Sequence, residues 1–224
     1  MLLGICGFAG SGKTTVSNML VQNHEYNQIA FADTVKDVTS VLFGWPRDLL
    51  EGDTPESRLF RETPDKFWSA RLDRIVTPRW ALQIMGTEAG RDAIHENIWI
   101  FCAEAKIKDH ENVIISDARF PNEIKFIREK GGYVIRVVRG SEPVWYETAY
   151  NHMVHDKYLM HQKYPEIHTS EWAWIGTDFD YVIYNNGSIE ELQEKVKYAL
   201  TTLQIRDTFS HSKMVNQGDY DYEV

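Results

Sequence analysis

The stretch Gly7-Phe8-Ala9-Gly10-Ser11-Gly12-Lys13-Thr14 follows an apolar run at residues 2–6 and leads into residues 15–20. It has the form G-x-x-x-x-G-K-[ST] between a predicted buried strand and a predicted helix, which is the context that this motif requires. The glycines let consecutive backbone N–H groups turn inward around phosphates, and the helix N-terminus adds partial positive charge. A glycine-rich turn with a chance lysine is the weaker alternative, because both flanking elements match. The stretch therefore predicts a nucleoside triphosphate site.

The side chains of this loop have separate predicted tasks. Lys13 can reach the β- and γ-phosphates of the nucleotide, and the hydroxyl of Thr14 can bind Mg²⁺. Lys13 is also predicted to be catalytic. The predicted phosphate-binding positions are Gly10, Ser11, Gly12, Lys13, Thr14 and Thr15.

Composition and charge narrow the class of protein. With 224 residues, of which 43% are apolar and 25% charged, the chain can form one large α/β domain with an insertion. The formal net charge of −9 does not suggest a basic stripe for duplex DNA or RNA, so no direct nucleic-acid binding is expected. The two cysteines, Cys6 and Cys102, have no motif spacing and are expected to be free thiols in a reducing compartment.

Neither a membrane segment nor a leader is expected. No apolar run approaches the roughly 20 residues that a membrane span needs. The glycine loop begins at residue 7, which is too early for a removable leader peptide. We therefore expect a cytoplasmic protein.

Apolar stretches separated by helical patterns predict the fold. The predicted strands are residues 2–6, 28–31, 113–117, 133–138 and 181–184. Because helices separate the strands and the phosphate loop follows the first of them, we expect a mostly parallel, doubly wound sheet. The predicted fold class is α/β, with three layers in which the five-stranded sheet is flanked by helices.

The organisation predicted along the chain is one domain with two long insertions. The domain covers residues 1–205, and insertions at about 46–111 and 140–180 are expected to be helical and to form substrate walls or a lid. Most of residues 46–76 are expected to be a solvated excursion, because their charges are dense and mixed. Residues 206–224 are polar and are predicted to be a flexible tail.

Charged residues follow two of the predicted strands. Asp117 ends the third strand, where open α/β sheets place ligands, and is predicted to help hold Mg²⁺; a structural N-cap role is the alternative. Arg119 is a candidate phosphate contact and catalytic residue, and Glu123 is a candidate ion-pair partner for it. Arg139 ends the fourth strand and is predicted to neutralise transition-state charge, with a surface cation as the alternative.

A further polar group lies between the second and third strands. A helix is predicted to begin at Pro78, which would place Arg79, Gln83 and Thr87 on one face. Such a set suits a phosphate and a nucleobase edge, although an ordinary surface helix is an equal alternative. The predicted substrate-binding positions are Asp33, Lys36, Arg79, Gln83, Glu88 and Arg91.

The chemistry of these candidates indicates the acceptor. A sugar or alcohol acceptor needs a carboxylate that takes its proton, whereas a phosphate acceptor already carries an oxyanion nucleophile and needs charge neutralisation. No evident acid–base pair is found, and cations are spread along residues 36–139. The pattern therefore favours transfer of the γ-phosphoryl group to another phosphate.

With these motifs the chain resembles the deoxynucleoside monophosphate kinases of tailed bacteriophages, within the wider nucleoside monophosphate kinase superfamily. The resemblance runs from residue 2 to about residue 203 and rests most on two blocks. These are Leu82-Gln83-Ile84-Met85-Gly86-Thr87-Glu88 with Arg91 and Trp99, and Ser116-Asp117-Ala118-Arg119-Phe120-Pro121-Asn122-Glu123. It also covers Gly7–Thr15, Phe31-Ala32-Asp33 with Lys36, and Asn185-Asn186-Gly187-Ser188.

The resemblance implies a P-loop kinase fold and an ATP-dependent phosphorylation reaction. ATP, with Mg²⁺, would phosphorylate deoxynucleoside monophosphates to diphosphates for DNA replication, in the host cytoplasm if the chain is phage-encoded. By position, Asn185, Asn186 and Gly187 would form the loop that holds adenine, and the substrate positions above would form the monophosphate pocket. The arginine-rich lid of adenylate kinases has no counterpart here beyond Arg136 and Arg139. A homodimer is left open.

Two other functions compete with this hypothesis. One is a P-loop kinase that acts on another small phosphorylated metabolite. The other is a nucleotide-switch ATPase that is not a kinase and binds a partner only with ATP.

Overall fold

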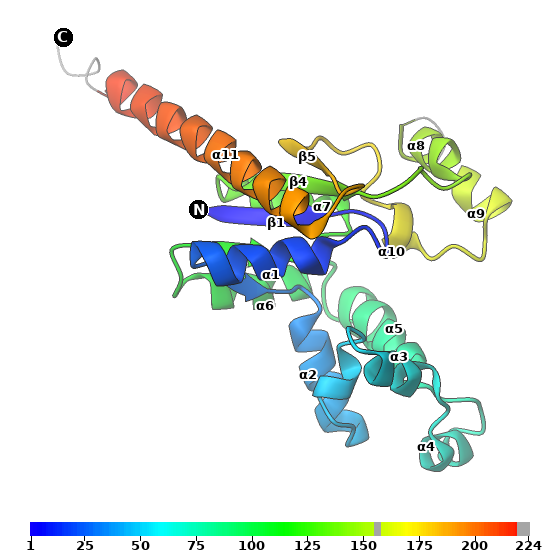
Figure 1. The fold of residues 1–224 in the computed structure, drawn as a ribbon. Helices are drawn as coiled ribbons and strands as arrows, with labels where there is room; N and C mark the ends of the chain where they lie inside the picture. The colour runs from blue at the N-terminus through cyan, green and yellow to red at the C-terminus, as the bar shows by residue number, and fades with distance from the viewer. Residues whose placement is uncertain (155–157, 219–224) are drawn as a thin grey trace, which may run out of the picture. The chain divides into compact units, whose positions relative to one another are not determined.

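The computed structural model describes residues 1–154 and 158–218 of the chain (Figure 1). They form two compact units, one made of Met1–Gln28 with the chain from Asn112 onward, and one made of Ile29–Glu111. The strands are β1 (Leu2–Cys6), β2 (Asn27–Ile29), β3 (Val113–Ile115), β4 (Tyr133–Val138) and β5 (Tyr181–Tyr184).

Helices fill most of the chain between these strands. The first unit contains α1 (Lys13–His24), α7 (Pro121–Glu129), α8 (Tyr146–Val154), α9 (Leu159–Lys163), α10 (Thr169–Trp172) and α11 (Ile189–Gly218). The second unit contains α2 (Asp33–Phe43), the 3₁₀-helix η1 (Asp48–Leu50), α3 (Pro55–Glu62), α4 (Lys66–Arg71), α5 (Pro78–Ile84), the π-helix η2 (Met85–Asp92) and α6 (Ile98–Ile107).

The sheet has five strands in the order β2-β3-β1-β4-β5. β1 pairs in parallel with both β3 and β4, and β4 pairs in parallel with β5. All residues of β1 are buried, as expected for the centre of a parallel sheet that is covered on both faces. Because parallel strands end at the same edge, the loops after β1, β3, β4 and β5 gather there. The predicted α/β fold with a five-stranded, mostly parallel sheet is confirmed.

Helices cover both faces of this sheet. One face carries α1 and α11, and residues such as Leu20 and Leu200 share a buried core there with Leu3 of β1. On the opposite face, Ile127 of α7 packs against Gly4 of β1. Figure 1 shows this layering, with α1 and α11 in front of β1 and α7 behind it.

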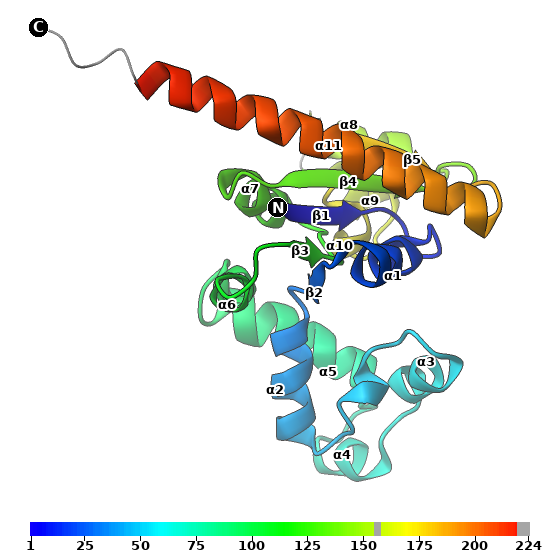
Figure 2. The same cartoon turned by 60° about the vertical axis from the view of Figure 1, so that its left-hand side comes forward.

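The last helix is longer than the sequence suggests. The flexible tail was expected to begin at residue 206, but α11 continues to Gly218 and extends past the sheet (Figure 2). Neither Gly nor Pro interrupts residues 189–217, so backbone hydrogen bonding continues after the apolar stripe has ended. Residues 219–224 of the predicted tail lie outside the described residues.

The second unit has a core of its own, which the charge pattern did not indicate. It contains Trp45, Leu50, Val76 and Ala81, with Phe43, Phe60, Trp68, Trp80 and Leu82 packed around them. Two indole groups are fixed by hydrogen bonds, since Trp45 Nε1 donates to Asp65 Oδ2 at 2.8 Å and Trp68 Nε1 donates to the Phe43 carbonyl at 2.9 Å. The segment that begins at residue 46 is therefore folded around widely spaced aromatic residues rather than solvated throughout.

The helix predicted from Pro78 changes its type within the unit. It starts as expected, because the Thr77 hydroxyl accepts a hydrogen bond from the Trp80 N–H, but α5 ends at Ile84 and the π-helix follows. A π-helix bonds i to i+5, so the predicted row of Arg79, Gln83 and Thr87 does not extend beyond Gln83.

None of the helices in residues 1–154 and 158–218 combines the length and apolar character that a membrane crossing requires.

A buried carboxylate closes the turn between β3 and α7. Glu123 is 2% exposed, and its Oε2 accepts the backbone N–H groups of Arg119 at 2.8 Å and Phe120 at 3.1 Å. This is a capping arrangement that satisfies N–H groups at the start of α7. Glu123, considered above as an ion-pair partner of Arg119, accepts the backbone N–H of that residue.

Replacing Glu123 by alanine tests this turn. Glu123→Ala leaves two partly buried N–H groups without that acceptor, so we expect the free energy of unfolding to fall by about 1–3 kcal/mol. Urea denaturation followed by circular dichroism measures the change. Glu129→Ala, which removes an exposed carboxylate from the same helix, is the control and should change stability by less than about 0.5 kcal/mol. Equal losses for both variants would contradict the assigned role.

Candidate active site

The loop between β1 and α1 has backbone angles that side chains rarely allow. Gly7 has φ of 141° and Gly12 has φ of 100°. A Cβ at Gly7 would collide with the Val137 carbonyl of β4, and a Cβ at Gly12 would collide with the side-chain amide of Asn185. Both positions therefore require glycine, and the loop is shaped by the ends of the neighbouring strands.

Lys13 is folded back over this loop. Its Nζ donates to the Gly7 carbonyl at 2.7 Å and to the Phe8 carbonyl at 2.8 Å. The buried hydroxyl of Ser11 has no hydrogen-bond partner among the described residues. A buried polar group without a partner is costly in a folded chain, and such groups often face a ligand. The loop thus presents an ammonium and a hydroxyl where phosphates are predicted to bind.

Burial is the main influence on the Lys13 ammonium. Burial and, to a smaller extent, the neighbouring Arg119 guanidinium lower the pKa of Lys13 to about 8, whereas Glu171 and Asp117 oppose the shift. The thiol of Cys6 is also close, but burial raises its pKa to about 12, so it is neutral at pH 7. Cys6 and Cys102 are both free cysteines.

Charged side chains follow β3 at the same edge of the sheet. Asp117 and Arg119 come two and four residues after the end of the strand, and both act electrostatically on Lys13. Arg119 Nη1 lies 3.2 Å from Glu171 Oε1 of α10. The structure therefore brings Lys13, Asp117 and Arg119 together, as predicted from their positions after parallel strands.

The predicted adenine loop supports the phosphate loop. Asn185 Nδ2 donates to the Ser11 carbonyl at 2.9 Å, and the Asn185 backbone N–H donates to the Val138 carbonyl at 2.7 Å. Asn186 Oδ1 accepts the Gly140 N–H at 2.8 Å. These contacts join the ends of β4 and β5 to the phosphate loop, a role that the sequence did not indicate.

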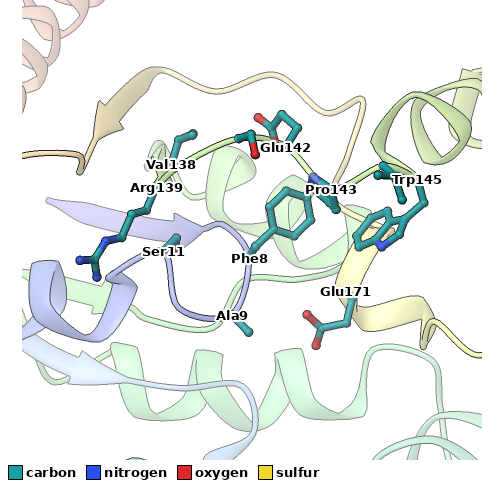
Figure 3. A pocket seen from close by; sticks show the side chains of 11 residues that line it. Phe8, Ala9, Ser11, Val138, Arg139, Glu142, Pro143, Trp145 and Glu171 are labelled. Atoms are coloured by element: carbon teal, nitrogen blue, oxygen red, sulfur yellow. The ribbon is translucent and has the colours of Figure 1, made fainter.

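A cavity of about 490 Å³ opens beside the phosphate loop (Figure 3). Figure 3 shows the lining residues, with Phe8 and Pro143 in the middle of the view, Trp145 and Glu171 to one side and Arg139 to the other. The volume is in the range typical of small-molecule sites. Arg139, predicted to be catalytic, therefore lines a cavity next to the loop, where its side chain is exposed.

Phe8 connects the loop to the segment after β4. Its ring centroid lies 5.3 Å from that of Trp145, 6.2 Å from that of Tyr146 and 4.8 Å from that of Trp174. Arg136 is stacked over Tyr146 and Trp174 and is paired with Glu142. Arg136 was a candidate lid arginine, but here its guanidinium is committed to this aromatic cluster.

The predicted monophosphate positions lie in the second unit. Lys36 Nζ is 2.6 Å from Glu51 Oε2 and 3.7 Å from Asp33 Oδ1. Arg47 pairs with the same two carboxylates and also with Asp37. These ion pairs raise the pKa of Arg47 and lower that of Glu51, although burial acts against both shifts.

The remaining predicted positions are on α5 and the π-helix. Arg79 pairs with Glu62 of α3, and Arg91 Nη1 donates to the Glu96 carbonyl at 3.3 Å. Gln83 and Glu88 are exposed. The structure thus places all six positions in one unit, and carboxylates of residues 51 and 62, which the sequence did not single out, hold two of the cations.

Comparison with known proteins identifies the family. A family model described as deoxynucleotide monophosphate kinase matches residues 69–196, which is more than half of the chain. The chain belongs to the deoxynucleotide monophosphate kinase family. The match covers Arg79, Gln83, Glu88, Arg91, Asp117, Arg119, Arg139, Asn185 and Glu171.

Two proteins that are similar in sequence to this kinase carry names of the same family. A protein of Acanthamoeba polyphaga mimivirus, provisionally named a deoxynucleotide monophosphate kinase, is 36% identical over 152 residues, with 62% of this chain and 74% of the relative covered. The deoxynucleoside-5'-monophosphate kinase of Escherichia phage T5 is 31% identical over 180 residues, with 58% of this chain and 72% of the relative covered. A solved shikimate kinase from Aquifex aeolicus is similar at a TM-score of 0.43 and 14% identity, over 92% of this chain and 99% of that one.

Replacing each of the two asparagines after β5 by aspartate separates their roles in the kinase. Asn185→Asp replaces the amide that donates to Ser11 by a carboxylate, so we expect binding of inorganic tripolyphosphate to weaken by about tenfold or more. Asn186→Asp adds the same charge but keeps its acceptor for Gly140, and it should weaken binding by less than about threefold. Isothermal titration calorimetry measures both. Equal weakening would show that added charge, not support of the loop, is responsible.

The lowered pKa of Lys13 predicts a pH dependence. The predicted contact with phosphate needs the protonated ammonium, which the unliganded kinase loses as the pH rises through about 8. Affinity for tripolyphosphate should therefore fall above pH 8 by up to about tenfold per pH unit, because one proton is linked to binding. Lys13→Arg keeps its charge in this range and should remove that dependence. The same slope in both proteins would assign the titration to another group.

Proposed function

We propose that this kinase transfers the γ-phosphoryl group of ATP to deoxynucleoside 5'-monophosphates and so forms diphosphates for DNA replication. The observation that supports the proposal most is the loop Gly7–Thr14, in which Lys13 lies over the loop carbonyls and beside Arg119. Membership of the deoxynucleotide monophosphate kinase family supports the choice of acceptor.

In the proposed donor site, backbone N–H groups at the start of α1 and the ammonium of Lys13 bind the phosphates of ATP. The phosphate-binding set is again Gly10, Ser11, Gly12, Lys13, Thr14 and Thr15. Arg119 and Arg139 neutralise the charge that develops on the transferred group. The Asn185–Gly187 loop is proposed to lie along the nucleoside of ATP, with its asparagine side chains holding the phosphate loop in shape.

The proposed metal site consists of Thr14 and Asp117. Thr14 is exposed in the first turn of α1, and Asp117 follows β3, which pairs with β1, so both oxygens belong to the same sheet edge. One hydroxyl and one carboxylate fit Mg²⁺, which is usually held by one or two protein oxygens together with phosphates and water. When bound, the ion would neutralise charge on the β- and γ-phosphates.

The proposed acceptor site lies in the second unit. Lys36, Arg79 and Arg91 would bind the monophosphate, while Asp33, Gln83 and Glu88 offer hydrogen bonds to the deoxynucleoside. The phosphate oxygen of the acceptor is already a nucleophile, so the protein supplies orientation and charge neutralisation rather than a general base. A cytoplasmic location and no direct binding to nucleic acid stay predictions of the sequence.

A coupled assay of ADP release tests the proposal. With ATP, Mg²⁺ and dAMP, dGMP, dCMP or dTMP, we expect at least one monophosphate to stimulate ADP release well above the rate with ATP alone. Lys13→Ala should lower this turnover by about three orders of magnitude or more, because it removes a cation from the transferred phosphoryl group. The variant is the control for contaminating kinases.

Other outcomes point to the competing functions. Stimulation by a different phosphorylated metabolite, and by none of the four monophosphates, would indicate a kinase with another acceptor. Slow ATP hydrolysis that no small acceptor changes would indicate a nucleotide switch. Either result would contradict the proposed substrate class.

A further inference from the structure

Glu171 is held next to the phosphate loop by buried aromatic residues. It lies on α10, between Ser170 and the buried Trp172. The Trp172 indole N–H donates to the Ile167 carbonyl at 3.3 Å, and the nearby Trp174 packs on Phe8 of the phosphate loop. Trp174 is 1% exposed, so this part of the chain is fixed by its core. The backbone that carries Glu171 is therefore anchored to the loop itself.

The side chain of Glu171 reaches Arg119 from this position. Its Oε1 lies 3.2 Å from Arg119 Nη1, and the two residues are 52 positions apart in the sequence. A guanidinium carries five N–H donors in a planar fork, and Nη1 accounts for two of them. The contact therefore sets the orientation of the guanidinium while leaving other donors for a phosphate.

The surroundings of Glu171 connect it to the proposed reaction. It lines the cavity that also contains Phe8 and Ala9 of the phosphate loop (Figure 3). It is also close enough to Lys13 to act on that ammonium electrostatically. Glu171 thus lies beside the two cations that are proposed to meet the transferred phosphoryl group, and it contacts one of them directly.

We propose that Glu171 is a positioning residue for phosphoryl transfer, whose carboxylate fixes the Arg119 guanidinium beside Lys13 and the phosphate loop. This inference rests on the proposed function. It assigns a task in the donor site to the segment after β4, which the sequence marked only as a wall or lid. The role acts through Arg119, so Glu171 itself need not touch the nucleotide.

A role in folding alone explains the contact less well. The side chains of Arg119 and Glu171 are 43% and 37% exposed. Ion pairs with this exposure contribute little to stability, because solvent and salt screen them. Loss of the Glu171 charge should therefore change turnover much more than the unfolding temperature.

Steady-state kinetics of Glu171→Gln tests the proposal. We expect kcat with the best deoxynucleoside monophosphate to fall by about 10- to 100-fold, because a misplaced catalytic group costs rate. The KM for ATP should change by less than about threefold, since the phosphate loop remains intact. Glu171→Asp keeps the charge on a shorter side chain and should recover part of the loss. Glu166→Gln, an exposed glutamate of the same segment, is the matched control and should keep the wild-type kcat.

A double-mutant cycle with Arg119→Gln shows whether Glu171 acts through Arg119. If it does, Glu171→Gln causes no further loss of kcat when Arg119 is already replaced. Multiplied losses, a kcat of Glu171→Gln within about twofold of the wild type, or tighter ATP binding at an unchanged kcat would each overturn the proposal. Thermal unfolding of every variant confirms that the compared proteins are folded.

The same experiment separates this proposal from the proposed function. Wild-type kinase that no deoxynucleoside monophosphate stimulates would contradict the function before Glu171 is considered. Stimulated wild-type kinase with an unaffected Glu171→Gln variant would contradict only the role of Glu171.

Discussion

The candidate active site depends on one close contact, in which the Lys13 ammonium lies against the carbonyl oxygens of Gly7 and Phe8. The contact forms because the loop passes through left-handed backbone conformations, one of them at Gly12. The end of β4 contacts the loop at Gly7, and Asn185 after β5 contacts it at Gly12. The strand ends that carry the charged residues thus also shape the loop between β1 and α1.

Pairing of cations with carboxylates recurs in both units. The cations concerned are Arg119, Lys36 and Arg79, and their respective partners are Glu171, Glu51 and Glu62. A cation held by a carboxylate keeps its orientation without a ligand, and the donors that are not engaged stay available to phosphate. Partly exposed pairs of this kind add little to folding stability, so their main effect is on the placement of charge.

The sequence predicted elements best where their signals were local. The helix predicted to begin at Pro78 does begin there as α5, and the Thr77 hydroxyl before it accepts the Trp80 N–H. The end of α11, the π-helix and the aromatic core of the second unit were not predicted. Each depends on packing or on a continuing backbone pattern, and a dense run of charges between residues 46 and 76 hid the apolar residues of that core.

By itself, the sequence determined the α/β class, the strand–loop–helix at Gly7–Thr14 and the edge of the sheet where Asp117 lies. Those features follow from contiguous residues and from the rule that parallel strands end together. Only the tertiary structure decided that Asn185 supports Ser11 and that Glu171 faces Arg119, across separations of 174 and 52 residues. Such contacts arise when a sheet edge gathers distant loops, and no local pattern of residues encodes which side chains then meet.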